Sequence, residues 1–145
     1  MNNADMLFNF STVLALLAWV YLVLFPSRPF THKMIVGAVV ALLGLLYASL
    51  LLDALPLLDF ASFKSLNGWA ALLQKPGMPL LLWVHILAFN LLAGVFIAAN
   101  AAKHGISYMM VLPYFIFTAT LGPVGFILYL LVRWNHTRNY FSDNF

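Results

Sequence analysis

Residues 83–94 read WVHILAFNLLAG, an apolar run that contains one histidine and one asparagine. Such a run suits a lipid bilayer, where a polar side chain is costly unless it faces protein, a ligand or a cavity. His85 and Asn90 are therefore the first candidates for functional residues. At 100° per residue their side chains diverge by about 140° around a helix. We expect them to line one cavity only if this helix is central in a bundle.

The composition places the chain in a membrane. Hydrophobic residues make up 64% of the 145 positions and charged residues 8%, whereas a soluble domain carries about 25% charged residues. The seven cations are scattered singly between apolar runs, which excludes the basic stripe of a nucleic-acid-binding protein. The expected surroundings are membrane lipid, and no nucleic-acid partner is predicted. The chain has no cysteine, so disulfides and thiolate metal sites are excluded.

Four apolar runs predict an all-α, integral membrane four-helix bundle that forms a single domain over residues 1–145. Each run is near the roughly 20 residues that a helix needs to cross the hydrocarbon core. The predicted spans are residues 6–25, 34–52, 78–102 and 106–132. We expect the bundle in a bacterial inner membrane or in a photosynthetic membrane.

The second span carries small residues at spacings of four, three and four. Small side chains on one face let another helix approach closely, so they predict a packing face. These residues are Gly37, Ala41, Gly44 and Ala48.

Residues 56–77 are too polar and too short for another span. Apolar residues recur there at every third position with polar residues between them, which is typical of short amphipathic helices in the membrane interface. Asn67-Gly68 predicts a break between two such helices. An ordinary interfacial loop is one interpretation, and a lid over a cavity is the other.

Four spans would bring both ends of the chain to the same side of the membrane. The loops on one side would then hold three cations, and the segments on the other side would hold four. This distribution gives no orientation. The first span has its cations after it, which favours an outside N-terminus.

Residues 118–125 read TATLGPVG and interrupt the fourth predicted span. Pro123 removes a backbone donor and frees a carbonyl oxygen one turn earlier, while Gly122 and Gly125 permit close backbone approach. The pattern predicts a kink within one spanning helix. Packing is the ordinary explanation of such a kink. The alternative is that the freed carbonyl and Thr118 contact a bound molecule.

Several kinds of site are missing from the sequence. It contains no glycine-rich phosphate loop and no HExxH motif, and its four histidines lie in separate segments. We therefore predict no metal site and no cofactor, although a single histidine can ligate a haem or a chlorophyll. Aromatic side chains within the spans, such as Tyr114, can stack on a conjugated ligand, whereas those at helix ends are ordinarily interfacial anchors.

Three groups of residues resemble the ABA4-like family, four-span membrane proteins named for the plant neoxanthin synthase of abscisic-acid biosynthesis. The groups are Asp59-Phe60 with residues 62–66, Trp83-Val84-His85 with residues 88–94, and Leu112-Pro113 with residues 121–126 and Arg133. The tryptophan–histidine motif and the Gly-Pro-x-Gly break are the most specific parts. The resemblance covers about the last two-thirds of the chain, and the first two spans match only in hydropathy.

The resemblance implies a carotenoid-linked activity. In the plant protein an epoxide of violaxanthin is isomerised to an allene without net redox change, which requires an acid and a base. His85 falls on the family's histidine and is the candidate catalytic residue. The candidate substrate-binding residues are Trp83, Phe89, Asn90, Tyr114 and Thr118.

Position 90 departs from the family pattern, which has aspartate there. An amide cannot exchange protons near neutral pH, which puts acid–base chemistry by Asn90 in doubt. Either another group carries the proton, or Asn90 only positions a ligand, or the protein has left this chemistry.

Two functions stay open on the sequence. The first is a redox-neutral isomerase of a carotenoid or a similar long apolar terpenoid, with His85 as proton carrier. The second is a non-catalytic protein that binds a lipid or pigment, or an accessory subunit of a membrane complex. A second copy of the chain or a larger membrane complex is the candidate protein partner. A cavity that exposes His85 favours the first function.

Overall fold

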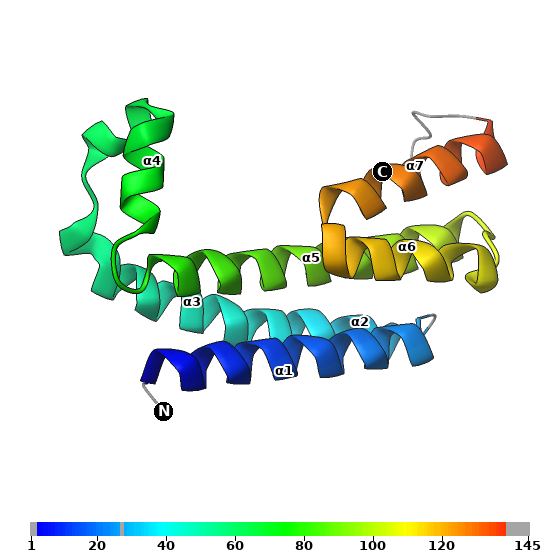
Figure 1. The fold of residues 1–145 in the computed structure, drawn as a ribbon. Helices are drawn as coiled ribbons and strands as arrows, with labels where there is room; N and C mark the ends of the chain where they lie inside the picture. Colours follow the sequence, from blue (N-terminus) through cyan, green and yellow to red (C-terminus); the bar gives the residue numbers. More distant parts are fainter. Residues whose placement is uncertain (1–2, 27, 139–145) are drawn as a thin grey trace.

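The computed structural model describes residues 3–26 and 28–138, and every regular element among them is a helix. Three helices are long and apolar enough to cross a membrane, and they lie side by side in Figure 1. They are α1 (Asn3–Leu24), the continuous helix formed by α2 (Pro29–Met34), η1 (Ile35–Val40) and α3 (Ala41–Ala54), and α5 (Met78–Lys103). The prediction of an all-α membrane bundle is confirmed.

Helix α5 lies at the centre of this bundle. It packs against α1, α3 and the helices that follow it, and its side chains Val84, Leu91 and Ile97 have no exposed surface. Gly94 lets α1 approach closely, because a Cβ atom on Gly94 would lie 2.5 Å from Cη2 of Trp19. Because α5 is central, His85 and Asn90, which lie on two sides of it, both have neighbours from other helices.

The small-residue face of the second span is not used within the chain. Gly37 and Gly44 are exposed, and no heavy atom of the described residues lies within 4 Å of a Cβ atom placed on either one. The buried face of this helix carries Ile35 and Leu43 instead. The larger branched side chains fill the space beside α5, so no described helix of the chain covers Gly37 or Gly44, and close packing on the small-residue face stays a prediction.

The predicted fourth span is two helices, α6 (Tyr108–Leu121) and α7 (Pro123–Thr137). The chain reverses at Gly122, which has φ 51° and ψ −106°, and α7 runs back beside α6 (Figure 1). The 14 residues of α6 reach only about 21 Å, less than the roughly 30 Å of a hydrocarbon core. The prediction of a single kinked helix over 106–132 is therefore wrong. We call residues 108–137 the hairpin.

Close backbone contact decides this reversal. A Cβ atom on Gly125 would overlap the backbone nitrogen of Thr118, so only glycine lets α7 cross α6 at this distance. Gly122 still donates its N–H to the Thr118 carbonyl oxygen over 3.0 Å, which ends α6 in an ordered way. Proline at position 123 then starts α7, since the first residue of a helix needs no backbone donor.

The segment between the second and third spans forms short helices, as predicted. They are η2 (Leu55–Leu57), η3 (Phe60–Lys64) and α4 (Leu66–Leu73), and α4 lies crosswise at one end of the spans (Figure 1). We call residues 55–73 the arm. The break between the two longer helices is at Ser65, whose hydroxyl accepts the Gly68 N–H at 3.0 Å. The predicted break at Asn67-Gly68 is wrong, because serine caps α4 and both residues lie inside it.

Candidate functional site

His85 is half-buried on α5, and its imidazole lies between two aromatic rings. The ring of Phe89 is stacked on it with centroids 4.5 Å apart, and the ring of Tyr47 from α3 is tilted against it at 5.4 Å. Neither ring nitrogen makes a hydrogen bond within residues 3–26 and 28–138. The imidazole is therefore held by ring contacts while its nitrogens stay available to a ligand.

A cavity of about 230 Å³ lies beside this imidazole, between α3, α5 and the arm. The helices α3 and α5 contribute Tyr47, Leu51, Met78, Leu81, Leu82 and His85, and the segment before α5 contributes Leu58, Phe63, Trp69, Leu72 and Leu73. The wall is apolar except for the tyrosine hydroxyl, the imidazole and the indole N–H. An apolar cavity with a few convergent polar groups is the usual form of a small-molecule site.

The arm is built to cover this cavity. Asp59 caps η3 by accepting the Ala61 N–H at 2.9 Å, and the Phe63 ring packs edge-on against Trp69 with centroids 5.2 Å apart. At the base of the arm, Lys75 Nζ donates to the Leu57 carbonyl oxygen over 2.6 Å. These local contacts hold the two aromatic rings at the wall of the cavity that His85 also lines, so the position of the arm fits the lid interpretation.

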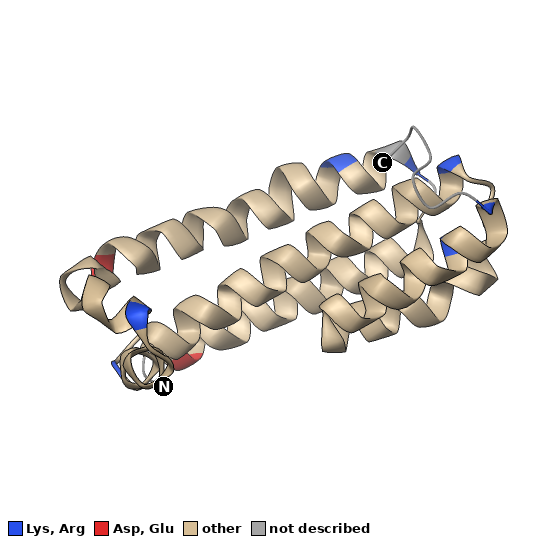
Figure 2. Cartoon of the chain, turned by 90° about the horizontal axis from the view of Figure 1, so that it is seen from above, with Lys and Arg blue, Asp and Glu red and all other residues tan. Residues whose placement is uncertain are grey.

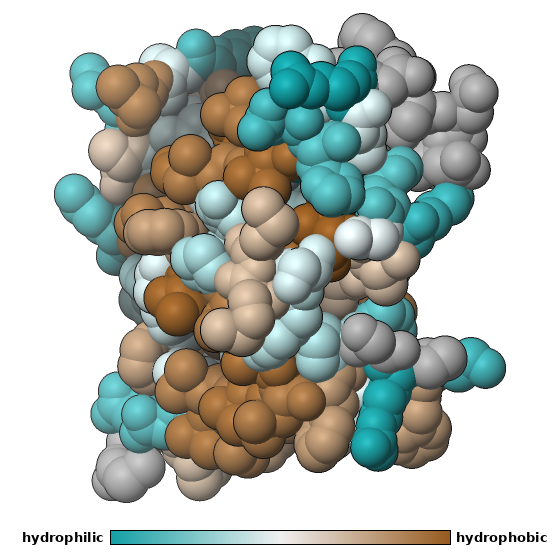
Figure 3. Space-filling model, turned by 90° about the vertical axis from the view of Figure 1, so that its right-hand side faces the viewer, coloured by the Kyte–Doolittle hydropathy of each residue, from teal (hydrophilic) through white to brown (hydrophobic). Residues whose placement is uncertain are grey.

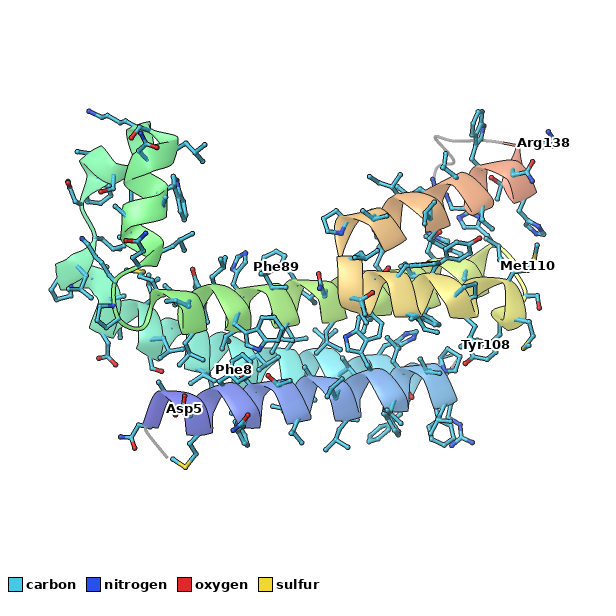
Figure 4. All side chains as sticks on the ribbon, viewed as in Figure 1. Asp5, Phe8, Phe89, Tyr108, Met110 and Arg138 are labelled. Carbon is cyan, nitrogen blue, oxygen red and sulfur yellow. The ribbon has the colours of Figure 1, made fainter. Side chains whose placement is uncertain are left out.

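The cavity is smaller than the roughly 300–1,000 Å³ of pockets that enclose a drug-sized ligand. It can take one ring-sized end group of a long molecule, with the remainder lying outside. Phe89 stands beside the cavity on the surface of α5, with 59% of its side chain exposed (Figure 4). A long apolar ligand would find this ring next to the imidazole.

Two of the predicted substrate-binding residues lie elsewhere, at the turn of the hairpin. The Asn90 side-chain oxygen lies 2.8 Å from the place of a Cβ atom on Gly122. Thr118 is fully buried against Gly125, and its hydroxyl has no hydrogen-bond partner among the described residues. Asn90 and His85 therefore face different neighbours, as their spacing predicts.

The remaining two candidates are packed into the bundle. Trp83 faces α1, where its Nε1–H donates to Thr12 Oγ1 over 2.8 Å and its ring lies 5.3 Å from that of Phe8. Tyr114 is half-buried on α6 and packs against the apolar core. Of the five predicted substrate-binding residues, the structure brings only Phe89 together with His85.

Sequence reasoning did not select Tyr47, Phe63 or Trp69 for the site. The regular spacing of aromatic residues in the arm was the signal for the latter two, because it suggested a lid. No local signal joins Tyr47 to His85, since 38 positions separate them and only the packing of α3 on α5 brings them together.

The titratable groups of the cavity are few. Tyr47 and His85 are its titratable side chains, and no aspartate lines it. No group of three metal-ligating side chains lies close together in the part of the chain that the structure describes. The chemistry that this arrangement can perform is therefore hydrogen bonding and proton transfer between a hydroxyl, an imidazole and a bound molecule.

A second polar cluster lies at the other end of α5. Tyr129 of α7 donates its hydroxyl to the side-chain oxygen of Asn100 on α5 over 2.6 Å. Arg133, which follows Tyr129 by one turn of α7, is fully buried. Burial lowers the pKa of His104 below its usual 6.5, and the nearby charges of Arg133, Lys103 and His136 lower it further. This cluster is remote from the His85 cavity.

Comparison with known protein families gives a match over most of the chain. The sequence model of a family described as ABA DEFICIENT 4-like matches residues 6–129. The match begins in α1, so it includes the first two spans and ends before Arg133. No curated protein and no solved structure matches the chain.

Proposed function

The chain belongs to the ABA4-like family, and on this premise we propose that it binds one end of a carotenoid, or of a similar long apolar terpenoid, and isomerises it without net redox change. One observation carries the proposal. His85 and Tyr47 both line one apolar cavity, and residues of the arm form part of its wall. The proposed location is a bacterial inner membrane or a photosynthetic membrane, in which such molecules dissolve.

The size of the cavity supports an end group as the bound part. A carotenoid carries its oxygen functions on terminal rings joined by a long apolar chain. A cavity of about 230 Å³ suits a ring, and the exposed Phe89 offers a stacking surface for the conjugated chain. The arm would exclude water from the ring, which strengthens polar contacts to its oxygen.

Isomerisation of an epoxide to an allene moves one proton in and one proton out. An acid protonates the epoxide oxygen as a carbon–oxygen bond breaks, and a base removes a proton from a neighbouring carbon. Imidazole can act as acid or base near neutral pH, and a phenol can donate to the oxygen. We assign removal of the carbon-bound proton to His85 as base, and donation of a proton to the epoxide oxygen to Tyr47 as acid.

This assignment gives Asn90 no part in proton transfer. Its side chain lies at the turn of the hairpin rather than in the cavity. The loss of the acidic group at position 90 is therefore compatible with an active protein, provided that Tyr47 supplies the second polar group.

The alternative function is a non-catalytic lipid- or pigment-binding protein, or an accessory subunit of a membrane complex. Two observations favour it. No carboxylate lines the cavity, and the small residues of the second span, including Gly37 and Gly44, face outward with open space above them. A second copy of the chain or a different membrane protein would fit closely on that face.

The test is expression in a carotenoid-producing bacterium, followed by pigment analysis. We expect the protein to convert an epoxy-carotenoid into an allenic product of equal mass. His85→Ala should abolish conversion, and Tyr47→Phe should slow it by about 10²-fold or more. Tyr114→Phe is the matched control, because it removes a hydroxyl outside the cavity, and it should convert normally.

Three other outcomes would change the conclusion. Stoichiometric retention of unchanged pigment, lost in Trp69→Ala, would decide for the binding function. If the unsubstituted protein neither changes nor retains any pigment, the carotenoid proposal is refuted. Asn90→Asp should leave conversion unchanged, and a gain of activity would place position 90 in the reaction after all.

A further inference from the structure

The hairpin enters the bundle from one end and returns to that same end. Its turn at Gly122 touches Asn90, which lies twelve residues after Met78 and thirteen before Lys103, in the middle of α5. At the start of the hairpin, Tyr108 donates its hydroxyl to the carbonyl oxygen of Val23, near the end of α1. The hairpin therefore reaches the middle of the bundle and does not cross it.

This path separates the charges by end, as Figure 2 shows. The end that holds the connections α1–α2 and α5–α6 and the last turn of α7 carries five cations, and none of the three described aspartates lies there. The cations are Arg28, Lys33, Lys103, Arg133 and Arg138. All except Arg133 are exposed. We call this end the cationic end, and Figure 3 shows it face-on with hydrophilic surface along its margins.

The opposite end carries the arm, the start of α1 and a different balance of charge. It holds two cations, Lys64 and Lys75, and three acids, Asp5, Asp53 and Asp59. Figure 4 labels Asp5 and Arg138 at the two extremes. With four crossings the cations would divide three against four, whereas with the hairpin they divide five against two. The cations therefore gather strongly at one end, whereas their division with four crossings indicates no orientation.

We propose that the cationic end lies against the anionic headgroups on the face from which the chain is inserted, the cytoplasmic face in a bacterium, and that the His85 cavity opens in the opposite leaflet. Lysine and arginine in short loops near span ends are retained on that face. Anionic lipids of that leaflet attract exposed cations. The four exposed cations of the cationic end complement the negative charge of such a surface.

The position of the cavity follows from this orientation. His85 lies seven residues after Met78, so it is about 10 Å along α5 from the end that carries the arm. A membrane-dissolved ligand would reach the imidazole from the leaflet that faces away from the cytoplasm. The orientation is independent of the proposed reaction. The inference about the leaflet from which a substrate enters rests on the proposed function.

Cysteine accessibility tests the orientation directly, because the chain has no native cysteine. Single variants Asn67→Cys in the arm, and Ser107→Cys and Asn135→Cys at the cationic end, each replace an exposed residue. In bacterial spheroplasts a membrane-impermeant maleimide should label Asn67→Cys. It should label Ser107→Cys and Asn135→Cys only after lysis.

Two labelling patterns would overturn the proposal. If Asn67→Cys and Asn135→Cys are labelled from the same side, α6 and α7 cross the membrane and the hairpin is not re-entrant. If the two cationic-end cysteines are labelled in spheroplasts while Asn67→Cys is protected, the orientation is reversed. Neither result depends on pigment binding, so failure here is distinct from failure of the proposed function.

A variant with three neutralised cations tests whether the charges of the cationic end orient the chain. Lys33→Gln, Lys103→Gln and Arg138→Gln combined in the Asn67→Cys background should make part of the arm cysteine inaccessible, because insertion becomes mixed. Lys64→Gln, a neutralised lysine at the other end, should leave labelling unchanged. Unchanged labelling in the triple variant would mean that these cations do not orient the chain.

The contact with anionic lipid has its own measurement. In phosphatidylcholine vesicles containing an equal part of phosphatidylglycerol, the Tm should be higher than in phosphatidylcholine alone. The difference should vanish in 1 M salt, because screening shortens the reach of the charges, and it should vanish in the triple variant. An equal Tm in both lipids would overturn the anionic-headgroup contact.

Discussion

The side-chain oxygen of Asn90 lies 2.8 Å from the position that a Cβ atom on Gly122 would occupy. This contact joins the polar residue of the third span to the Gly-Pro break of the hairpin. Non-helical backbone at membrane depth needs protein or a water-filled cavity around it. Protein surrounds this turn on the side of α5, where Asn90 packs against Gly122, so the asparagine has a packing role that does not require chemistry.

Gly122→Ala should destabilise the protein, because position 122 has a backbone conformation that is strained for alanine and has no room for its methyl group. Strain of this kind costs about 1–3 kcal/mol, and the clash with Asn90 adds to it. Thermal unfolding in detergent, followed by circular dichroism, measures the loss. Gly105→Ala is the matched control, since Gly105 has φ 66° but open space around a Cβ atom. Equal losses in both variants would show that Asn90 does not restrict the turn.

Gly94→Ala should lower the unfolding free energy by about 1–3 kcal/mol, the usual cost of overpacking a core. The added methyl group would meet the Trp19 ring, which is 7% exposed and packed in the centre of the bundle. Gly44→Ala adds the same methyl group to a spanning helix at an open, exposed position. The prediction fails if denaturant unfolding gives the same midpoint for both variants.

Gly68→Ala should loosen the arm while leaving the spans intact. A Cβ atom there would overlap the carbonyl oxygen of Ser62, so α4 must move away from η3. Ser65→Ala removes the α4 cap, which typically costs about 1 kcal/mol. Hydrogen exchange measured by mass spectrometry should quicken in residues 55–73 and stay unchanged in α5. Asn67→Ala changes an exposed residue of the same helix, and it should exchange like the unsubstituted protein.

Acidification should destabilise the protein in part through His104. Its pKa is lowered in the folded state, chiefly by burial and then by Arg133, Lys103 and His136. The unfolded chain therefore binds a proton more readily, and stability falls as the pH drops through the ordinary histidine value of about 6.5. The Tm should fall less between pH 7.5 and pH 5.5 in His104→Gln. A His104 titration midpoint at or above 6.5, measured by NMR, would contradict this.

The helices of the core were predictable from single segments. The spans over 6–25 and 78–102 agree with α1 and α5 within a few residues, because long apolar runs in lipid must satisfy their backbone groups internally. The second span continues past residues 34–52 at both ends, since Phe30 and the residues up to Leu57 are also helical. Hydropathy marks the lipid-facing part of a helix better than its ends.

The candidate site was predictable only in part. Helical spacing separated His85 from Asn90 correctly, and Phe89, a candidate substrate-binding residue, is stacked on His85. Of the other candidates, Trp83 and Tyr114 pack into the bundle, and Thr118 lies with Asn90 at the turn of the hairpin, so none of these lines the cavity of His85. A residue's position along one helix shows its face, but the neighbour that covers the face depends on the whole bundle.

Local features of the sequence were enough to predict an all-α membrane protein of the ABA4-like family, with short helices between the second and third spans and a break at Gly122-Pro123. The physical reason is local, since apolar length, prolines and glycines act on the backbone near them. The reversal of the chain at this break was not predictable, since it depends on the contacts of Gly125 with the α6 backbone and of Gly122 with Asn90. The cavity that Tyr47, His85 and the arm line together also depends on tertiary packing, because no local signal joins Tyr47 to His85.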